Sequence, residues 1–204
     1  MSSRSQRWPR GPKNELHHVA AHRGSIGLLS RGSINIDQGD PNGFTPLMYA
    51  AKKGFSRVAK VLINRGANLS IAADRGFSAL HISAEDGHLE VTLELVKAGV
   101  NLEARQVDGA TPLHRAGDMG HSEVVAALVE TGAIVDSRSD TGTTPLYSAA
   151  SAGYVDIVRQ LLRAKANTLL CKTDLQGRLY APLVAAASGG HSKVVRELIK
   201  QCGI

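Results

Sequence analysis

The sequence predicts an all-α solenoid built from stacked helix-turn-helix repeats with projecting β-turn or hairpin loops. The first observation is a tripeptide that recurs three times with a period of 33 residues and once more after 37. Its copies are Thr45-Pro46-Leu47, Ser78-Ala79-Leu80, Thr111-Pro112-Leu113, Thr144-Pro145-Leu146 and Ala181-Pro182-Leu183. The other two observations are glycines at fixed places in each copy and apolar residues at helical spacing between them. A period of this length indicates a repeat architecture.

The tripeptide marks the start of the first helix of each copy. A Thr or Ser hydroxyl accepts a hydrogen bond from a free N–H group in the first helical turn, and proline suits the first helical position because its φ is already set. A glycine follows eight residues after the middle position of every tripeptide, at Gly54, Gly87, Gly120, Gly153 and Gly190. We therefore expect a short helix that ends at this glycine.

A second helix is predicted after each of these glycines. In the copy that begins at Thr111, Val124, Val125, Leu128 and Val129 lie at helical spacing. Three copies then place a glycine where a helix C-terminus favours a left-handed residue, at Gly66, Gly99 and Gly132. The next copy has Lys165 at this position, where a left-handed lysine should cost about 1 kcal/mol.

Turn-forming residues separate one copy from the next. The segment 68–76 carries Asn, Asp and Gly, which are typical of tight turns. Each unit is therefore a helix, a turn, a second helix and a β-turn loop. Neither helix can bury its apolar stripe alone, so neighbouring units are expected to stack into one continuous core.

The segments that carry these features resemble the ankyrin repeat. The resemblance rests on Asp108-Gly109-Ala110-Thr111-Pro112-Leu113-His114, on Gly120-His121-Ser122-Glu123-Val124-Val125 and on Gly132-Ala133, and it covers roughly residues 14–204. It implies L-shaped units of two antiparallel helices with a projecting hairpin, stacked into a curved solenoid with a concave groove. It also implies that five histidines form hydrogen bonds that tie the turns together: His81, His88, His114, His121 and His191.

Six units are expected in one array behind a short N-terminal tail. The tail is predicted over residues 1–13 and the array over residues 14–204, with repeats at approximately 14–37, 38–70, 71–103, 104–136, 137–169 and 170–204. The first unit is degenerate, because its glycines Gly24 and Gly32 are eight residues apart where later copies have twelve. The last unit has extra residues near Arg178, and its second helix is apolar like that of an internal repeat. A further unit, or a longer protein, is therefore an open alternative.

Composition indicates the cellular setting. Of the 204 residues 43% are hydrophobic, which suffices for a core, yet no apolar run is long enough to span a membrane. The start of the sequence lacks the apolar segment of a secretory signal peptide. Cys171 and Cys202 match neither a CxxC redox pair nor a zinc-site spacing. We therefore expect a monomeric array without membrane insertion, in a reducing intracellular setting, cytoplasmic or nuclear.

Positive charge is concentrated in the tail. Residues 1–13 contain Arg4, Arg7, Arg10 and Lys13 without an acid, so they hold four of the six net positive charges and leave the array with +2. Trp8 lies among them and can add stacking. Such a tail can contact acidic partners, anionic lipid or nucleic acid, but it offers few phosphate contacts. A solvated disordered start is the favoured interpretation, and a transit peptide is a weaker one.

Residues that resemble parts of catalytic or metal sites have ordinary places in the repeat. Asp140-Thr141-Gly142-Thr143 matches an aspartic-protease signature, but that chemistry needs two aspartates that share a proton, and the segment occupies the turn position held elsewhere by 74–76. His18 and His22 can share a helix face, yet no third metal ligand is evident. We expect no catalytic residue, metal, cofactor or small-molecule substrate.

The resemblance places partner-binding residues on the hairpin tips and on the exposed face of the first helices. The tip residues are Pro41, Asn42, Phe44, Asp74, Arg75, Phe77, Val107, Asp108, Asp140, Thr141 and Thr143, and the helix residues are Lys52, Lys53, Glu85, Asp86, Asp118, Met119 and Ser151. Phe44 and Phe77 are equivalent, so either they form neighbouring aromatic anchors or each folds back on its own hairpin. The change of charge along the first helices favours a partner of mixed charge over a uniformly anionic polymer.

The predicted function is that of a non-enzymatic scaffold or adaptor that binds another protein through the concave groove and the hairpin tips. A fold does not by itself dictate a function, so this prediction depends partly on analogy. Two alternatives stay open. In the first, the chain is the regulatory ankyrin-repeat portion of a longer multidomain enzyme or channel. In the second, it binds nucleic acid weakly through the basic tail.

Overall fold

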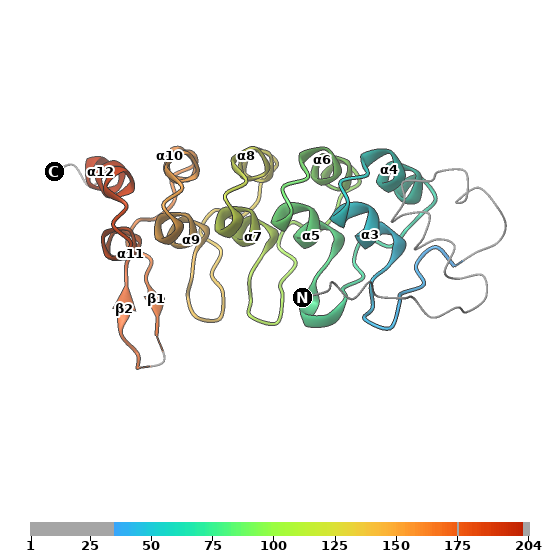
Figure 1. Cartoon of the computed structure of the whole chain (residues 1–204), viewed down its shortest axis with the longest axis horizontal. Coiled ribbons are helices and arrows are strands. Elements are labelled where there is room, and N and C mark those ends of the chain that lie inside the picture. The colour runs from blue at the N-terminus through green and yellow to red at the C-terminus, as the bar shows by residue number, and fades with distance from the viewer. Residues whose placement is uncertain (1–34, 175, 202–204) are drawn as a thin grey trace, which may run out of the picture.

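A computed structural model describes residues 35–174 and 176–201, which form one row of stacked helix pairs (Figure 1). The first helices of successive units are α3 (Pro46–Lys52), α5 (Ala79–Glu85), α7 (Pro112–Met119), α9 (Pro145–Ala152) and α11 (Pro182–Ser188). The second helices are α4 (Ser56–Asn64), α6 (Leu89–Lys97), α8 (Ser122–Glu130), α10 (Val155–Arg163) and α12 (Ser192–Gln201). Several predicted features lie outside the described residues: the basic tail, most of the unit predicted at 14–37, His18, His22 and Cys202.

The helices form two layers with loops on one side. Figure 1 shows the second helices in one row, the first helices in a row beneath them, and the loops projecting from the first helices away from the second. The predicted all-α solenoid is therefore confirmed. Short elements occur within the loops: the 3-10 turn η1 (Asp74–Gly76) and the antiparallel strands β1 (Lys172–Thr173) and β2 (Leu179–Tyr180).

Hydroxyl groups cap the N-termini of α3 and α9, as the tripeptide predicts. The Thr45 Oγ1 accepts a hydrogen bond from the Met48 N–H at 3.3 Å, and the Thr144 Oγ1 accepts one from the Tyr147 N–H at 3.1 Å. Proline occupies the first turn of α3, α7, α9 and α11. Each of these helices thus begins where an orphan N–H group is either capped or absent.

The second helices end at residues with left-handed backbone. Gly66, Gly99 and Gly132 have φ angles of 81°, 80° and 100°. Lys165 stands in the equivalent place and has a φ of 64°, so it keeps the left-handed backbone of the glycines that it replaces. Its side chain is exposed.

Replacing Lys165 by glycine is expected to stabilise the array by about 0.5–1 kcal/mol. Glycine relieves the left-handed strain, and its greater freedom in the unfolded chain offsets part of that gain. The free energy of unfolding from urea titrations followed by circular dichroism measures the effect. Lys60→Gly is the matched control, because Lys60 is also exposed but lies inside α4, where glycine should cost about 1 kcal/mol. A loss of stability at both positions contradicts the prediction.

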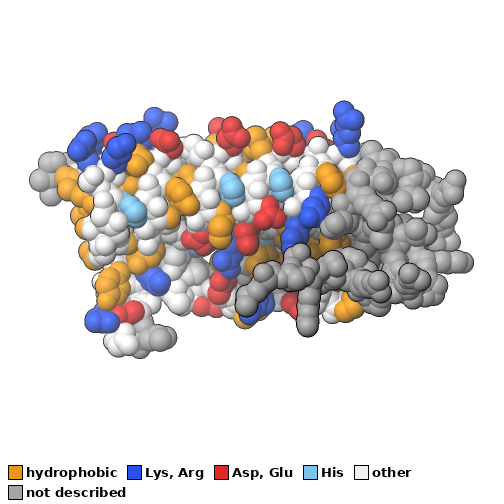
Figure 2. Space-filling view, in the orientation of Figure 1, with side chains coloured by type: hydrophobic (Ala, Val, Ile, Leu, Met, Phe, Trp, Pro, Cys, Tyr) orange, Lys and Arg blue, Asp and Glu red, His pale blue; other side chains and the backbone are white. Residues whose placement is uncertain are grey.

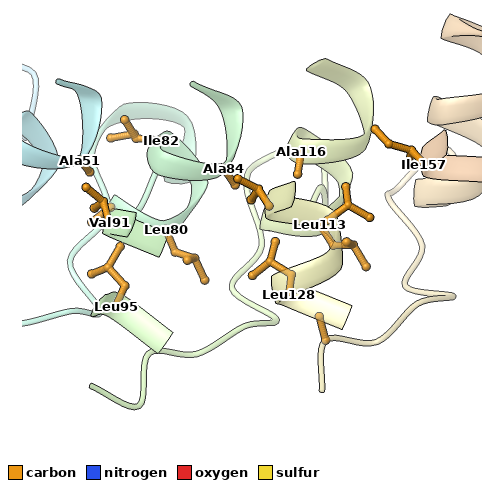
Figure 3. Packing of buried hydrophobic residues seen from close by; sticks show 14 of the residues in the cluster. Ala51, Leu80, Ile82, Ala84, Val91, Leu95, Leu113, Ala116, Leu128 and Ile157 are labelled. Carbon is orange, nitrogen blue, oxygen red and sulfur yellow. The ribbon is translucent and has the colours of Figure 1, made fainter. Parts of the chain in front are cut away.

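The core is a continuous series of buried leucines and alanines that extends from unit to unit along the described array. Leu62, Leu95, Leu128 and Leu161 occupy equivalent positions on the second helices, and all are 0% exposed. Figure 3 shows Leu80 and Leu95 of one unit followed by Leu113 and Leu128 of the next. Alanines such as Ala51, Ala84 and Ala116 fill the remaining space and allow the short first helices to approach closely.

Two buried histidines link the first helices to the next hairpin. In His81 the Nε2–H donates to the Ala110 carbonyl oxygen at 3.2 Å, and Nδ1 accepts from the Ser78 N–H at 3.3 Å. His114 repeats the pattern: its Nε2–H donates to the Thr143 carbonyl oxygen at 2.8 Å, and Nδ1 accepts from the Thr111 N–H at 3.2 Å. These contacts use both nitrogens of a neutral imidazole. Burial lowers the pKa of His81 to about 4 and also lowers that of His114.

Three further histidines link each inter-helix turn to the preceding unit. His88, His121 and His191 donate from Nε2 to the carbonyl oxygens of Lys52, Glu85 and Ser151 at 3.2, 2.8 and 3.0 Å. Histidine side chains appear at intervals across the face seen in Figure 2. These bonds, with those of the two buried histidines, confirm the role that the resemblance implies. In the unit between His121 and His191 the ring of Tyr154 takes this place instead, packed over Gly120.

The hairpin tips are joined in series by backbone hydrogen bonds. The Asp74 N–H donates to the Asn42 carbonyl oxygen at 3.3 Å, and the Asp140 N–H donates to the Asp108 carbonyl oxygen at 3.0 Å. At the last hairpin, the Thr173 N–H of β1 donates to the Thr141 carbonyl oxygen at 2.8 Å. The extra residues of the last unit lengthen this hairpin, which forms β1 and β2.

Candidate protein-binding site

The predicted partner-binding residues lie at the surface, and twelve of them gather in two hollows between the hairpins and the first helices. All eighteen are exposed or half-buried. The first hollow contains Asn42, Phe44, Lys52, Asp74, Phe77, Glu85 and Asp86, and the second contains Asp108, Asp118, Thr141, Thr143 and Ser151. The remaining six line neither hollow: Pro41, Lys53, Arg75, Val107, Met119 and Asp140.

The first hollow has an aromatic floor between α3 and α5. It measures about 390 Å³, and its lining is completed by Ile82. The Phe44 ring lies 5.6 Å from the Tyr49 ring, and the Lys52 ammonium lies 5.7 Å from the Phe44 centroid. The Phe77 ring packs against His81 at 6.4 Å. Each phenylalanine thus packs against its own helix, and both line one hollow. Their role as binding anchors stays a prediction.

Carboxylates give the first hollow a surplus of negative charge. Asp74, Glu85 and Asp86 face the single ammonium of Lys52. Within residues 35–174 and 176–201, none of the three carboxylates forms an ion pair. Glu85 ends α5 and Asp86 caps it, where the helix dipole disfavours a negative charge by about 0.3–1 kcal/mol each. Stability of α5 therefore does not account for these two acids.

The second hollow lies between α7 and α9 and is nearly balanced in charge. It measures about 440 Å³, and hydroxyl groups of Ser and Thr residues make up much of its lining. Arg115 forms ion pairs with Asp108 at 2.7 Å and Asp118 at 4.0 Å. The Lys172 ammonium lies 5.6 Å from the Tyr147 ring centroid on the other side. Burial opposes ionisation of Asp108, but the Ala110 N–H and the Arg115 guanidinium outweigh it and lower the pKa of this carboxyl group.

Several lining residues of the second hollow are not among the predicted site residues, including Arg115, Tyr147 and Lys172. Arg115 follows the histidine of the tripeptide region, Tyr147 replaces that histidine in the next unit, and Lys172 lies in the irregular last unit. The substitution of tyrosine for the expected histidine was a usable signal for Tyr147. Arg115 and Lys172 had none, because their positions depend on how neighbouring hairpins pack.

A third hollow lies between the second helices α8, α10 and α12. It measures about 540 Å³ and is lined by Tyr154, Arg159, Lys193, Arg196 and Glu197 among others. The Arg159 guanidinium bonds Glu197 at 3.0 Å across two helices. This surface is more basic than the other two and was not predicted.

The aspartic-protease-like segment serves as a turn. The Arg105 guanidinium bonds the Asp140 carboxylate at 3.0 Å, and the Asp140 N–H joins the preceding hairpin. In the described part of the chain, no three His, Cys, Asp or Glu residues converge as metal ligands. The same residues include no helix that is both long and apolar enough to cross a membrane.

Comparison with known proteins finds similarity over much of this array. A family model of ankyrin repeats in three copies matches residues 16–106 and again residues 80–170. Ankyrin repeat, SAM and basic leucine zipper domain-containing protein 1 of Dasypus novemcinctus is 39% identical over 70 residues, which are 33% of this chain and 15% of that protein. Its namesake in Mus musculus is 38% identical over 66 residues, 31% of this chain and 14% of that protein. Delta-latroinsectotoxin-Lt1a of Latrodectus tredecimguttatus is 43% identical over 58 residues, 26% of this chain and 5% of that protein.

Proposed function

The chain belongs to the ankyrin repeat family, and on this premise we propose that it is a non-enzymatic scaffold or adaptor that holds another protein between its hairpins and first helices. Ankyrin repeats are in general protein-protein interaction modules rather than enzymes. The observation that carries the proposal is the first hollow, where Phe44 and Phe77 lie between charged side chains. Aromatic anchors inside a polar rim are typical of the residues that dominate binding energy.

The charge of the two hollows supports a partner of mixed charge. The first hollow presents a surplus of carboxylates, and the second pairs Arg115 and Lys172 with Asp108 and Asp118. A uniformly anionic polymer would be repelled at the first hollow. The partner is therefore a protein segment that offers basic and apolar groups to α3 and α5.

We also place this function inside the cell, in the cytoplasm or the nucleus, on a monomeric array. Support for the intracellular setting comes from Cys171, which is a free thiol at a half-buried position. Reducing compartments keep such thiols unpaired.

Replacing both anchors, Phe44→Ala with Phe77→Ala, is expected to reduce partner capture about thirtyfold. Loss of binding anchors costs 2 kcal/mol or more in typical interfaces, which corresponds to that factor. The measurement is affinity capture from cell lysate with quantitative mass spectrometry, with native protein and variant side by side. Circular dichroism melting must show that the variant is folded.

The matched control changes exposed residues of a second helix instead. Glu123→Gln with Glu130→Gln alters two exposed residues of α8, away from both hollows, and should capture the same proteins as the native chain. Captured proteins that are retained by the folded phenylalanine variant contradict the proposed anchors.

A second candidate function is the regulatory portion of a longer multidomain enzyme or channel. Val184 and Ile199 of the last unit are 46% and 38% exposed, whereas the equivalent His81 and Leu162 of internal units are 0% and 8% exposed. Apolar residues of this kind suit contact with a further packed unit. The length of the endogenous protein on an immunoblot tests this: a mass equal to the 21.6 kDa of these residues removes the candidate.

A further inference from the structure

The first hollow is the one of the three hollows with a net negative lining. Its three carboxylates, Asp74, Glu85 and Asp86, outnumber the single ammonium of Lys52. The second hollow balances two acids with two bases, and the third has more bases than acids. Two of the three carboxylates also lie at the C-terminal end of α5, where the helix dipole disfavours them. The first hollow therefore suits a cationic segment that carries an apolar group for its aromatic floor.

This chain contains a segment with that chemistry. Residues 1–13 carry four cations and no acid, and they include Trp8, the single tryptophan of the sequence. Trp8 lies directly after Arg7 and two residues before Arg10, so one large aromatic side chain is flanked by guanidinium groups. Arginine and tryptophan are among the residue types enriched at binding hot spots. An indole ring also suits a site where Lys52 lies over Phe44, because cations favour aromatic faces.

The length of the tail is sufficient for this contact. Thirteen extended residues reach at most about 45 Å, whereas packed helices are spaced by about 10 Å. With the first unit at 14–37 as the sequence predicts, the tail begins one unit away from α3. A short tether also holds the tail at an effective concentration in the millimolar range, so a contact with a dissociation constant of about 1 mM is already half occupied.

We propose that the first hollow is a docking surface for residues 1–13 of the same chain. Trp8 lies against Phe44 and Phe77, and the flanking arginines face the three carboxylates. The tail thereby occupies the surface that the proposed function gives to the partner, so a partner must displace it. This regulatory consequence depends on the proposed function, whereas occupancy of the hollow by the tail does not.

Quenching of Trp8 fluorescence by acrylamide in the purified full chain tests the occupancy, because no other tryptophan contributes to the signal. The hollow variant combines Asp74→Asn, Glu85→Gln and Asp86→Asn, which removes three charges and retains the shapes of the side chains. We expect the quenching constant of this variant to exceed that of the native chain about twofold or more. The docked state is then less populated, so acrylamide reaches Trp8 more often. Raising NaCl from about 0.05 M to about 1 M should raise the native value in the same direction.

The matched control removes three exposed carboxylates from the second helices. Glu90→Gln, Glu123→Gln and Glu130→Gln change the net charge equally and leave the first hollow intact. Equal quenching constants in all three proteins overturn the proposal, and so does an equal rise in both variants. Circular dichroism must show equal helix content. The quenching experiment contains no partner protein, so its result does not depend on whether the capture experiment succeeds. A failed quenching experiment likewise leaves the proposed protein-binding function untouched.

Discussion

Lowering the pH from 7 to 5 is expected to remove about 2 kcal/mol from the free energy of unfolding, and the loss should reach about 3 kcal/mol below pH 4, through His81 alone. The side chain is 0% exposed, and burial lowers its pKa from 6.5 to about 4. Its hydrogen bond to the Ala110 carbonyl opposes this change, and the charge of Arg115 adds to it. A second proton would also place an N–H group on Nδ1, which accepts from the Ser78 N–H.

The sign follows from which state binds more protons. Between pH 6.5 and 4 the unfolded chain carries a protonated histidine and the folded chain does not, so stability falls as the pH falls. His114 acts in the same direction because its pKa is also lowered. Carboxyl groups with lowered pKa, such as Asp108, lose their contribution only below about pH 4. The window from pH 5 to 7 therefore isolates the histidines.

Urea titrations at half-unit steps from pH 5 to 7 measure this slope. His81→Gln lowers stability at pH 7, because a buried hydrogen-bonded ring is lost, and it should remove most of the His81 share of the pH dependence. A variant that keeps the full native slope contradicts the assignment to His81.

Gly87→Ala is expected to destabilise the array by about 3 kcal/mol, against about 1 kcal/mol for Gly99→Ala. Both glycines have left-handed backbone, with φ angles of 75° and 80°, so both substitutions incur the same strain. A methyl group at Gly99 meets nothing within 4 Å, whereas one at Gly87 would lie 2.6 Å from Cε1 of His121. The His121 ring is held by its bond to the Glu85 carbonyl oxygen, so overpacking adds about 1–3 kcal/mol.

A double-mutant cycle identifies the cause. In a His121→Ala background the ring is absent, and Gly87→Ala should cost only about as much as Gly99→Ala does, about 1 kcal/mol. The measurement is again the free energy of unfolding in urea. If Gly87→Ala costs the same with and without the ring, contact with His121 is not the source of the effect.

The local elements of this fold could be predicted because each has a local cause. Thr45 caps its helix through its own hydroxyl, and Lys165 adopts a left-handed backbone because the helix ends there whatever residue is present. The hollows could not be predicted in the same way. Arg115 reaches Asp108 from a helix to a hairpin tip, and Lys172 covers Tyr147 from the next unit. Such contacts depend on the packing of side chains between units, which the period of the sequence does not encode.

Tyr154, which stands where other units have histidine, also shows what the repeat pattern does not predict. A repeat pattern predicts a hydrogen bond at this turn, whereas the structure has an aromatic ring packed over Gly120. The backbone arrangement is retained although the chemistry of the link differs. Position in a repeat therefore predicts where a link lies better than it predicts how the link is made.

The spacing of the two hollows restricts the length of anything that binds both. The first lies between α3 and α5 and the second between α7 and α9, two units further along the row in Figure 1. Two helix spacings of about 10 Å place them about 20 Å apart, which an extended chain covers in about six residues. A single strand that occupies both hollows must carry its two contact groups at about that interval. The array thus selects the segments that bind both hollows by the spacing of their contact groups as well as by their charge.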